Sequence, residues 1–151
     1  MKSDKVLVAH LMRRAGFGAT PEELDELTNS KSYTEIVDDL VTPERFEDID
    51  MSHVERYYGG EPVAVHVGKW LFRMTNTKRP LEEKMSLFLH HLFPVAWGKS
   101  EHGPSIYNEI NMFREVGLTN FRNILVHLSK DPAMIFWLDN NENIGISVCK
   151  L

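Results

Sequence analysis

The sequence has only one cysteine, Cys149, among its 151 residues. A single cysteine rules out an intrachain disulfide, and with it the class of small secreted domains held together by disulfides. No apolar run approaches the about 20 residues of a membrane-spanning helix. The N-terminal residues lack the apolar segment and the small-residue cleavage site of a secretory signal peptide. We therefore expect a soluble, cytoplasmic protein with no membrane association.

A concentrated basic stretch is missing as well. The net charge is −5, and the nearest approach to a basic cluster, Arg13-Arg14, is typical of the C-terminal end of a helix. Nucleic-acid-binding domains usually carry a basic face, so we expect no nucleic-acid partner. A glycine-rich phosphate loop is also lacking, because Gly16-Phe17-Gly18 is too short and follows no strand.

What the sequence does contain is a succession of helix signals. Apolar residues recur at helical spacing through most of the chain, and no run alternates convincingly with a period of two. We therefore predict an all-α protein, an irregular multi-helix bundle of about seven or eight helices with little or no sheet. A chain of 151 residues with 42% hydrophobic residues is expected to form one ordinary domain or a piece of a larger one.

Capping residues mark where the predicted helices start. Thr20 with Glu23, and Ser32 with Glu35, have the spacing of a capping box. The other predicted starts are Ser3 or Asp4, Val63, Pro80, Ser105, Thr119 or Asn120, and Asp131-Pro132. Two stretches are predicted as connections: residues 44–62, with a helical turn near residues 52–58, and residues 96–104.

The helix predicted over residues 80–93 combines the most core-forming and chemically capable side chains. Successive helical residues turn by about 100°. On this basis one broad face is apolar and is predicted to face the core: Leu81, Met85, Phe88, Leu89, Leu92 and Phe93. Glu83, Ser86 and His90 share the opposite strip, whereas His91 points elsewhere.

Glu83 and His90 are the candidate site residues of this strip. A carboxylate near an imidazole can orient it, or the two can share a metal, so the pair is a candidate acid–base site with His90 as a candidate metal ligand. Such a strip is more often a solvated helix face, or a histidine packed at a helix–helix contact. The spacing of seven residues is too long for direct pairing without another group, and it matches neither the His-Glu-x-x-His nor the Glu-x-x-His pattern of helical metal sites. His102, in a predicted loop beside Glu101, is the best candidate partner from a second element.

The ordered landmarks of the chain resemble a known family. They are His10-Leu-Met-Arg-Arg-Ala-Gly-Phe-Gly-Ala-Thr20, Trp70-Leu-x-x-Met74, Arg79-Pro-Leu-Glu-Glu-Lys-Met85, Leu87-Phe-Leu-His90, Phe93 and Asp131-Pro-Ala-Met-Ile-Phe-Trp-Leu-Asp-Asn140. Together, over residues 4–143, they resemble the N-terminal part of the bacterial domain-of-unknown-function family DUF1800. The resemblance implies a mostly helical fold and no settled activity. Members are often encoded beside a frequently exported, sulfatase-related family, which implies a protein partner of that kind.

The sequence departs from the family pattern at two places. Leu89 stands where the family usually has tryptophan before the histidine, although His90 matches. Residues 144–151 fit no family pattern, whereas relatives continue with further helices. We therefore expect residues 1–143 to be the N-terminal part of a larger helical domain, with an unplaced tail from a truncated or frameshifted reading frame. Apolar faces that dock on the absent part would then be exposed.

Two functions fit these observations. In the first, intact relatives are metal-assisted hydrolases to which His90 and Glu83 contribute, and this chain alone is an inactive fragment. In the second, the chain is a non-enzymatic helical interaction or assembly module for the sulfatase-like partner. The sequence identifies no cofactor for either function.

Overall fold

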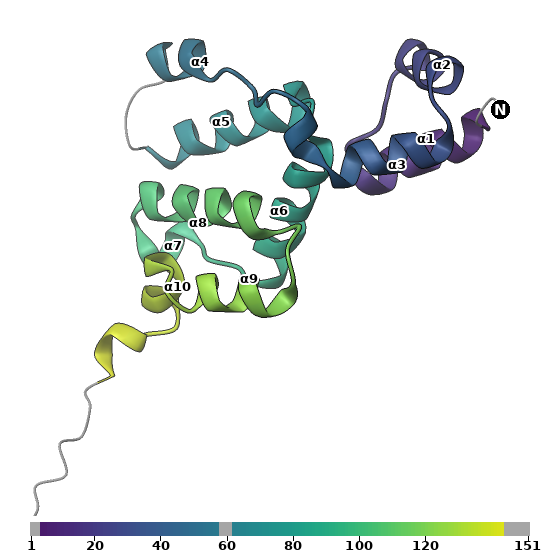
Figure 1. Ribbon diagram of the computed structural model, residues 1–151. Coiled ribbons are helices and arrows are strands. Elements are labelled where there is room, and N and C mark those ends of the chain that lie inside the picture. Colours follow the sequence, from purple (N-terminus) through teal and green to yellow (C-terminus); the bar gives the residue numbers. More distant parts are fainter. Residues whose placement is uncertain (1–3, 58–61, 144–151) are drawn as a thin grey trace, which may run out of the picture.

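The computed structural model describes residues 4–57 and 62–143, and every regular element within those ranges is helical (Figure 1). The elements are α1 (Lys5–Ala15), α2 (Pro21–Ser30), α3 (Tyr33–Val41), η1 (Pro43–Arg45), α4 (Ser52–Tyr57), α5 (Val63–Asn76), α6 (Pro80–Leu92), α7 (Trp97–Ser100), α8 (Gly103–Val116), α9 (Phe121–Leu128), α10 (Pro132–Trp137) and η2 (Asn140–Glu142). The predicted all-α class is confirmed. Residues 144–151, with Cys149, lie outside the described ranges.

The α-helices number ten in the described part of the chain, more than the predicted seven or eight, because the short helices α4 and α7 add to those whose starts were predicted. One of these short helices, α7, falls inside the predicted loop over residues 96–104, so that loop prediction was wrong. The helical turn predicted near residues 52–58 is confirmed as α4. None of the described helices is long and apolar enough to cross a membrane.

Local capping accounts for five of the predicted helix starts, whereas α5 and α6 begin without a side-chain cap and α8 begins at Gly103, two residues before the predicted Ser105. The Thr20 side chain accepts a hydrogen bond from Glu23 N, and the Glu23 carboxylate accepts one from Thr20 N at 2.7 Å. Ser32 and Glu35 form the same reciprocal capping box. Asp4, Asn120 and Asp131 cap α1, α9 and α10 with their side chains. Each cap satisfies backbone N–H groups that the helix itself leaves unpaired.

The core consists of two apolar clusters, and α6 reaches both. The first cluster lies among α1, α2 and α3 around Val8, Ile36 and Leu40, and Leu81 of α6 packs against it. The second lies among α6, α8, α9 and α10, with Phe113 fully buried and Leu89 of α6 as a member. Figure 1 shows α1–α3 grouped at one side of the molecule and α8–α10 at another, with α6 between them.

The orientation of α6 differs from the prediction. Phe88 and Leu92, predicted to face the core, are 54% and 49% exposed, whereas Glu83 and Ser86 on the predicted outer strip are fully buried. Leu89 is the one member of the predicted apolar face that is buried, at 2% exposed. The polar strip therefore faces inward, because α5 and α8 supply charged and polar partners that a helical wheel does not contain.

Candidate functional site

His90 and Glu109 come from two helices that pack against each other, α6 and α8. On α8 the buried residues follow one helical face: Ile106, Glu109, Ile110, Phe113 and Val116. Glu109 thus occupies a core position among aliphatic and aromatic residues. Because α6 turns its polar strip toward this face, the imidazole of His90 meets the carboxyl group of Glu109.

The contact between the two side chains is a hydrogen bond of 3.2 Å between Nδ1 of His90 and Oε2 of Glu109. The Glu109 side chain is completely buried and that of His90 is 23% exposed. Burial raises the pKa of Glu109 above its ordinary value, and the hydrogen bond and charge of His90 oppose that rise. The other carboxyl oxygen, Oε1, has no hydrogen-bond partner among the described residues.

A small cavity of about 190 Å³ lies beside His90. Its walls are mainly apolar and aromatic, with residues of α5, α6, α7 and α8 contributing: Val63, His66, Val67, Trp70, His90, Val95, Trp97, Gly103, Ile106, Tyr107 and Ile110. The Trp70 ring meets the His90 ring edge-on, with the ring centroids 5.7 Å apart. His90 is therefore held between a buried carboxyl group and an indole while it borders a cavity.

Glu83 occupies a different environment, a buried network of charged side chains. Its Oε1 accepts hydrogen bonds from Nε of Arg73 at 2.8 Å and from Nε of Arg114 at 2.6 Å. Its Oε2 accepts from Nη2 of Arg114 at 3.1 Å and from Nε1 of Trp70 at 3.0 Å. Asp48 then binds Arg73 at 2.6 Å, so two carboxylates balance two guanidinium groups.

The structure thus separates the roles of the two predicted site residues. Glu83 has four hydrogen bonds and is completely buried, and these contacts link α5, α6 and α8. His90 instead binds Glu109. Trp70 joins the two groups, because its N–H donates to Glu83 while its ring contacts His90.

The other histidines considered from the sequence lie elsewhere. His102 accepts a hydrogen bond from Ser105 N and caps α8 from an exposed position. His91 is exposed on α6. Within residues 4–57 and 62–143, no group of three or more histidine, cysteine, aspartate and glutamate side chains is arranged to hold a metal ion.

Glu109 is the residue that the sequence analysis missed, although the sequence carries a signal for it. A carboxylate stands three residues after Ile106 and four before Phe113, within the apolar spacing of α8. Such a charged residue in a core pattern is expected to have a polar partner when it is buried. The identity of that partner depends on the packing of α6 against α8.

The geometry defines what His90 can do chemically. With Nδ1 bonded to Glu109, Nε2 is the nitrogen that remains for a substrate, a water molecule or a metal ion. A buried carboxyl group bonded to one imidazole nitrogen fixes the orientation of the ring and the position of its proton. The same arrangement occurs in acid–base catalysis and in metal sites.

Comparisons with known proteins give a family for this chain and no activity. No curated protein and no solved structure matches the chain. Residues 10–147 match a family described as a protein of unknown function, DUF1800. That match covers both helices of the His90–Glu109 pair and the whole Glu83 network. The chain belongs to the DUF1800 family.

Proposed function

We propose that His90 is the acid–base group of a hydrolytic site and that Glu109 is its positioning residue. The observation that supports this proposal is the 3.2 Å hydrogen bond between a fully buried carboxyl group and a histidine that borders a cavity. In this role Nε2 of His90 takes a proton from the attacking water and passes it to the leaving group. Glu109 holds the ring in place and balances the charge that the imidazole acquires.

Glu83 supports this site indirectly in the proposal. Its bond to Trp70 fixes the indole against which the His90 ring rests. A metal-assisted form of the reaction would use Nε2 of His90 as one ligand, with Glu109 as the carboxylate behind it. Further ligands would then come from outside the group of side chains described above.

Two neighbouring histidines provide a matched test. Wild-type protein, His90→Asn and His91→Asn would be assayed with three esters: p-nitrophenyl acetate, p-nitrophenyl phosphate and p-nitrophenyl sulfate. Each assay would be run with EDTA and with added Zn²⁺ or Mn²⁺. Loss of a general base lowers the rate by about 10²–10⁴-fold, so His90→Asn should lose turnover while the exposed His91→Asn retains it. Glu109→Gln should retain binding and lose most of the rate.

The results can contradict the proposal clearly. Equal rates for the two histidine variants, or no turnover of any of the three esters by the wild-type protein, would exclude it. Bound metal would be measured in the same samples. An identical metal content in wild type and His90→Asn would exclude His90 as a metal ligand. The acid–base role of His90 would still be decided by the rates of the variants.

A second candidate function is a helical interaction module. It is supported by the outward face of α6, where Leu87, Phe88 and Leu92 are exposed, and by exposed Phe121 and Leu125 on α9. We also propose that residues 1–143 are part of a larger helical domain that covers such faces. The partner implied by the family resemblance is a sulfatase-like protein. Co-expression with that protein should yield a complex that Phe88→Ser with Leu92→Ser disrupts, and recovery of the two proteins apart would exclude this function.

A further inference from the structure

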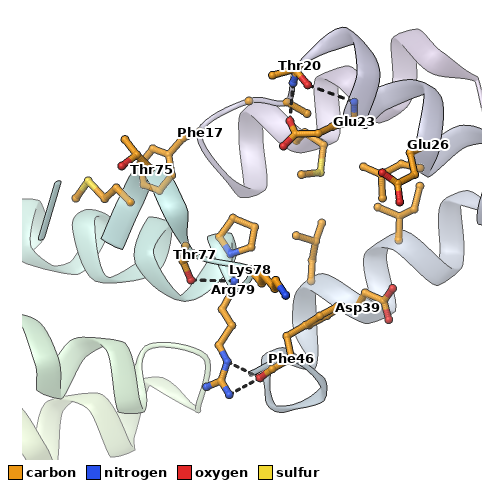
Figure 2. Close-up of a pocket in the computed structure, with 18 of the residues that line it drawn as sticks. Phe17, Thr20, Glu23, Glu26, Asp39, Phe46, Thr75, Thr77, Lys78 and Arg79 are labelled. Atoms are coloured by element: carbon orange, nitrogen blue, oxygen red, sulfur yellow. Dashed lines mark hydrogen bonds between the residues drawn. The ribbon is translucent and has the colours of Figure 1, made fainter. Parts of the chain in front are cut away.

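A second, larger pocket lies between the N-terminal helices and the α5–α6 connection. Its volume is about 970 Å³, which is in the range of pockets that enclose a drug-sized ligand. Figure 2 shows its walls, with Phe17, Thr20 and Glu23 above and Thr77, Lys78, Arg79 and Phe46 below. The two pockets have no lining residue in common.

Most of the wall is apolar. The apolar lining residues come from α1, the loop after it, α2, α3, α5 and the start of α6: Met12, Phe17, Ala19, Leu27, Ile36, Leu40, Phe46, Leu71, Met74 and Pro80. Leu71 and Phe17 are partly exposed and so present apolar surface to whatever enters. The apolar part of a ligand would gain free energy by covering this surface.

Most of the charged lining residues already have hydrogen-bonding or ionic partners. Asp39 binds both Lys31 at 2.7 Å and Arg45 at 3.2 Å, and Glu23 is committed to its capping box with Thr20. Arg79 donates from Nε and Nη2 to the backbone carbonyl of Phe46. These groups hold the walls together and are already satisfied.

Lys78 and Glu26 are the exceptions. Within the described ranges, neither side chain has an oppositely charged group at salt-bridge distance, as judged from the ion pairs found there. Figure 2 shows Lys78 beside Arg79 in the α5–α6 connection, whereas Glu26 lies across the pocket on α2. The α5–α6 wall therefore presents two adjacent cationic side chains, one of them without a carboxylate, next to apolar Leu71 and Met74.

We propose that this pocket binds an amphipathic organic anion, with its apolar body against the α1–α3 and α5 side chains and its anionic head on Lys78. A carboxylate, sulfonate or phosphate head would satisfy the ammonium group of Lys78. Glu26 stands apart on the opposite wall and disfavours a second negative charge at that end. The expected ligand thus has one anionic end and one apolar end.

Three probes of equal chain length test the choice of head group. Decanoate, decanol and decylamine would each be titrated into the full chain by isothermal titration calorimetry, below their micelle concentrations. Decanoate should bind at one site and more tightly than the other two. Equal affinity for decanol, tighter binding of decylamine, or no binding of decanoate would overturn the proposal.

Matched variants test the position. Lys78→Gln should weaken decanoate binding about fivefold, the effect of one partly exposed ion pair. Leu71→Glu, at an exposed lining position, should weaken it further. Lys130→Gln, on the exposed surface outside the pocket, should have no effect, and Glu26→Gln should leave binding equal or tighter. Circular dichroism would verify that each variant is folded. Equal affinities for Lys78→Gln and Lys130→Gln, or a loss confined to Glu26→Gln, would contradict the assignment.

Discussion

Nδ1 of His90 lies 3.2 Å from Oε2 of Glu109, and His90 is the only hydrogen-bond partner of this buried carboxyl group among the described residues. Burial disfavours the charged form of Glu109, and the imidazole of His90 can share a proton with that carboxyl group. This balance makes the stability of the protein depend on pH in a direction that can be measured.

Replacing Glu109 with glutamine should remove a pH-dependent destabilisation. Because burial raises the pKa of Glu109 above its ordinary 4.5, the folded protein holds that proton more tightly than the unfolded chain does. The free energy of unfolding of the wild type should therefore fall, relative to Glu109→Gln, as pH rises from about 4.5 through the raised pKa. Urea unfolding at several pH values between about 4 and 8 would measure the difference.

The exposed Glu115→Gln is the matched control for this experiment, since it removes a carboxylate from the same helix. Its free energy of unfolding should follow the wild type at every pH. Parallel curves for wild type and Glu109→Gln would show that the carboxyl group is not buried as described.

Removing the charge of Glu83 should destabilise the fold strongly. Glu83→Gln would leave the guanidinium groups of Arg73 and Arg114, whose side chains are 7% and 11% exposed, without their shared carboxylate. Breaking a buried ion pair in this way costs about 3–5 kcal/mol. Urea unfolding near pH 7 should show this loss for Glu83→Gln and a change within about 0.5 kcal/mol for Glu115→Gln. A small loss for Glu83→Gln would indicate that the network is solvated.

Gly117 should tolerate no side chain, in contrast to Gly98. A Cβ atom at Gly117 would lie 2.5 Å from the carbonyl oxygen of Phe113 and 3.2 Å from Cδ1 of Leu89, whereas at Gly98 it would meet nothing within 4 Å. Gly117→Ala should therefore lower the free energy of unfolding by about 1–3 kcal/mol. Gly98→Ala, in α7, should leave it unchanged or raise it slightly. Similar thermal stabilities for the two variants would contradict the close approach of α6 to the end of α8.

Adjacent residues of α6 test which face of that helix is buried. Leu89→Ala should lower the free energy of unfolding by about 2–5 kcal/mol, because Leu89 is 2% exposed within the second cluster. Phe88→Ala removes a larger side chain that is 54% exposed, and should cost less than about 1 kcal/mol. The predicted wheel orientation places both side chains in the core and so requires a loss of about 3–5 kcal/mol for Phe88→Ala as well. Chemical denaturation of these two variants therefore distinguishes the two orientations.

The helix starts were predictable because their causes are local. Thr20 with Glu23, and Ser32 with Glu35, need only each other to form a capping box, and both boxes are present. The loop over residues 96–104 was predicted from its glycines and proline, yet four of its residues form α7. A helix this short is fixed by packing, here against α8 and α10, rather than by its own sequence.

The buried face of α6 was not predictable from the helix itself. Phe88 and Leu92, which a helical wheel assigns to the core together with Leu89, are exposed in the structure, whereas Leu89 is buried. The decisive partners of Glu83 are Arg73 and Arg114, which are 10 and 31 residues away in the sequence. Burying a carboxylate is unfavourable unless such partners are present, and only the tertiary structure brings them together.

The candidate site was only partly predictable, because it too depends on a partner that the tertiary structure supplies. The sequence analysis singled out His90, and the structure places this residue beside a cavity. The sequence analysis, however, paired His90 with Glu83 on the same helix. The carboxylate that contacts His90 is Glu109, from α8. The proposed catalytic roles of these residues stay predictions until the rates of the histidine variants are measured.

The position of Trp70 gives the molecule an internal optical reporter. Its indole N–H donates to Glu83 while its ring packs edge-on with that of His90, so the emission of this one residue senses both the charged network and the candidate site. The chain has three tryptophans, and with Trp97 and Trp137 replaced by phenylalanine the fluorescence would belong to Trp70 alone. Protonation of the neighbouring imidazole, occupation of the cavity and loss of the Glu83 contact could then each be followed in solution by intensity and wavelength, before any substrate is identified.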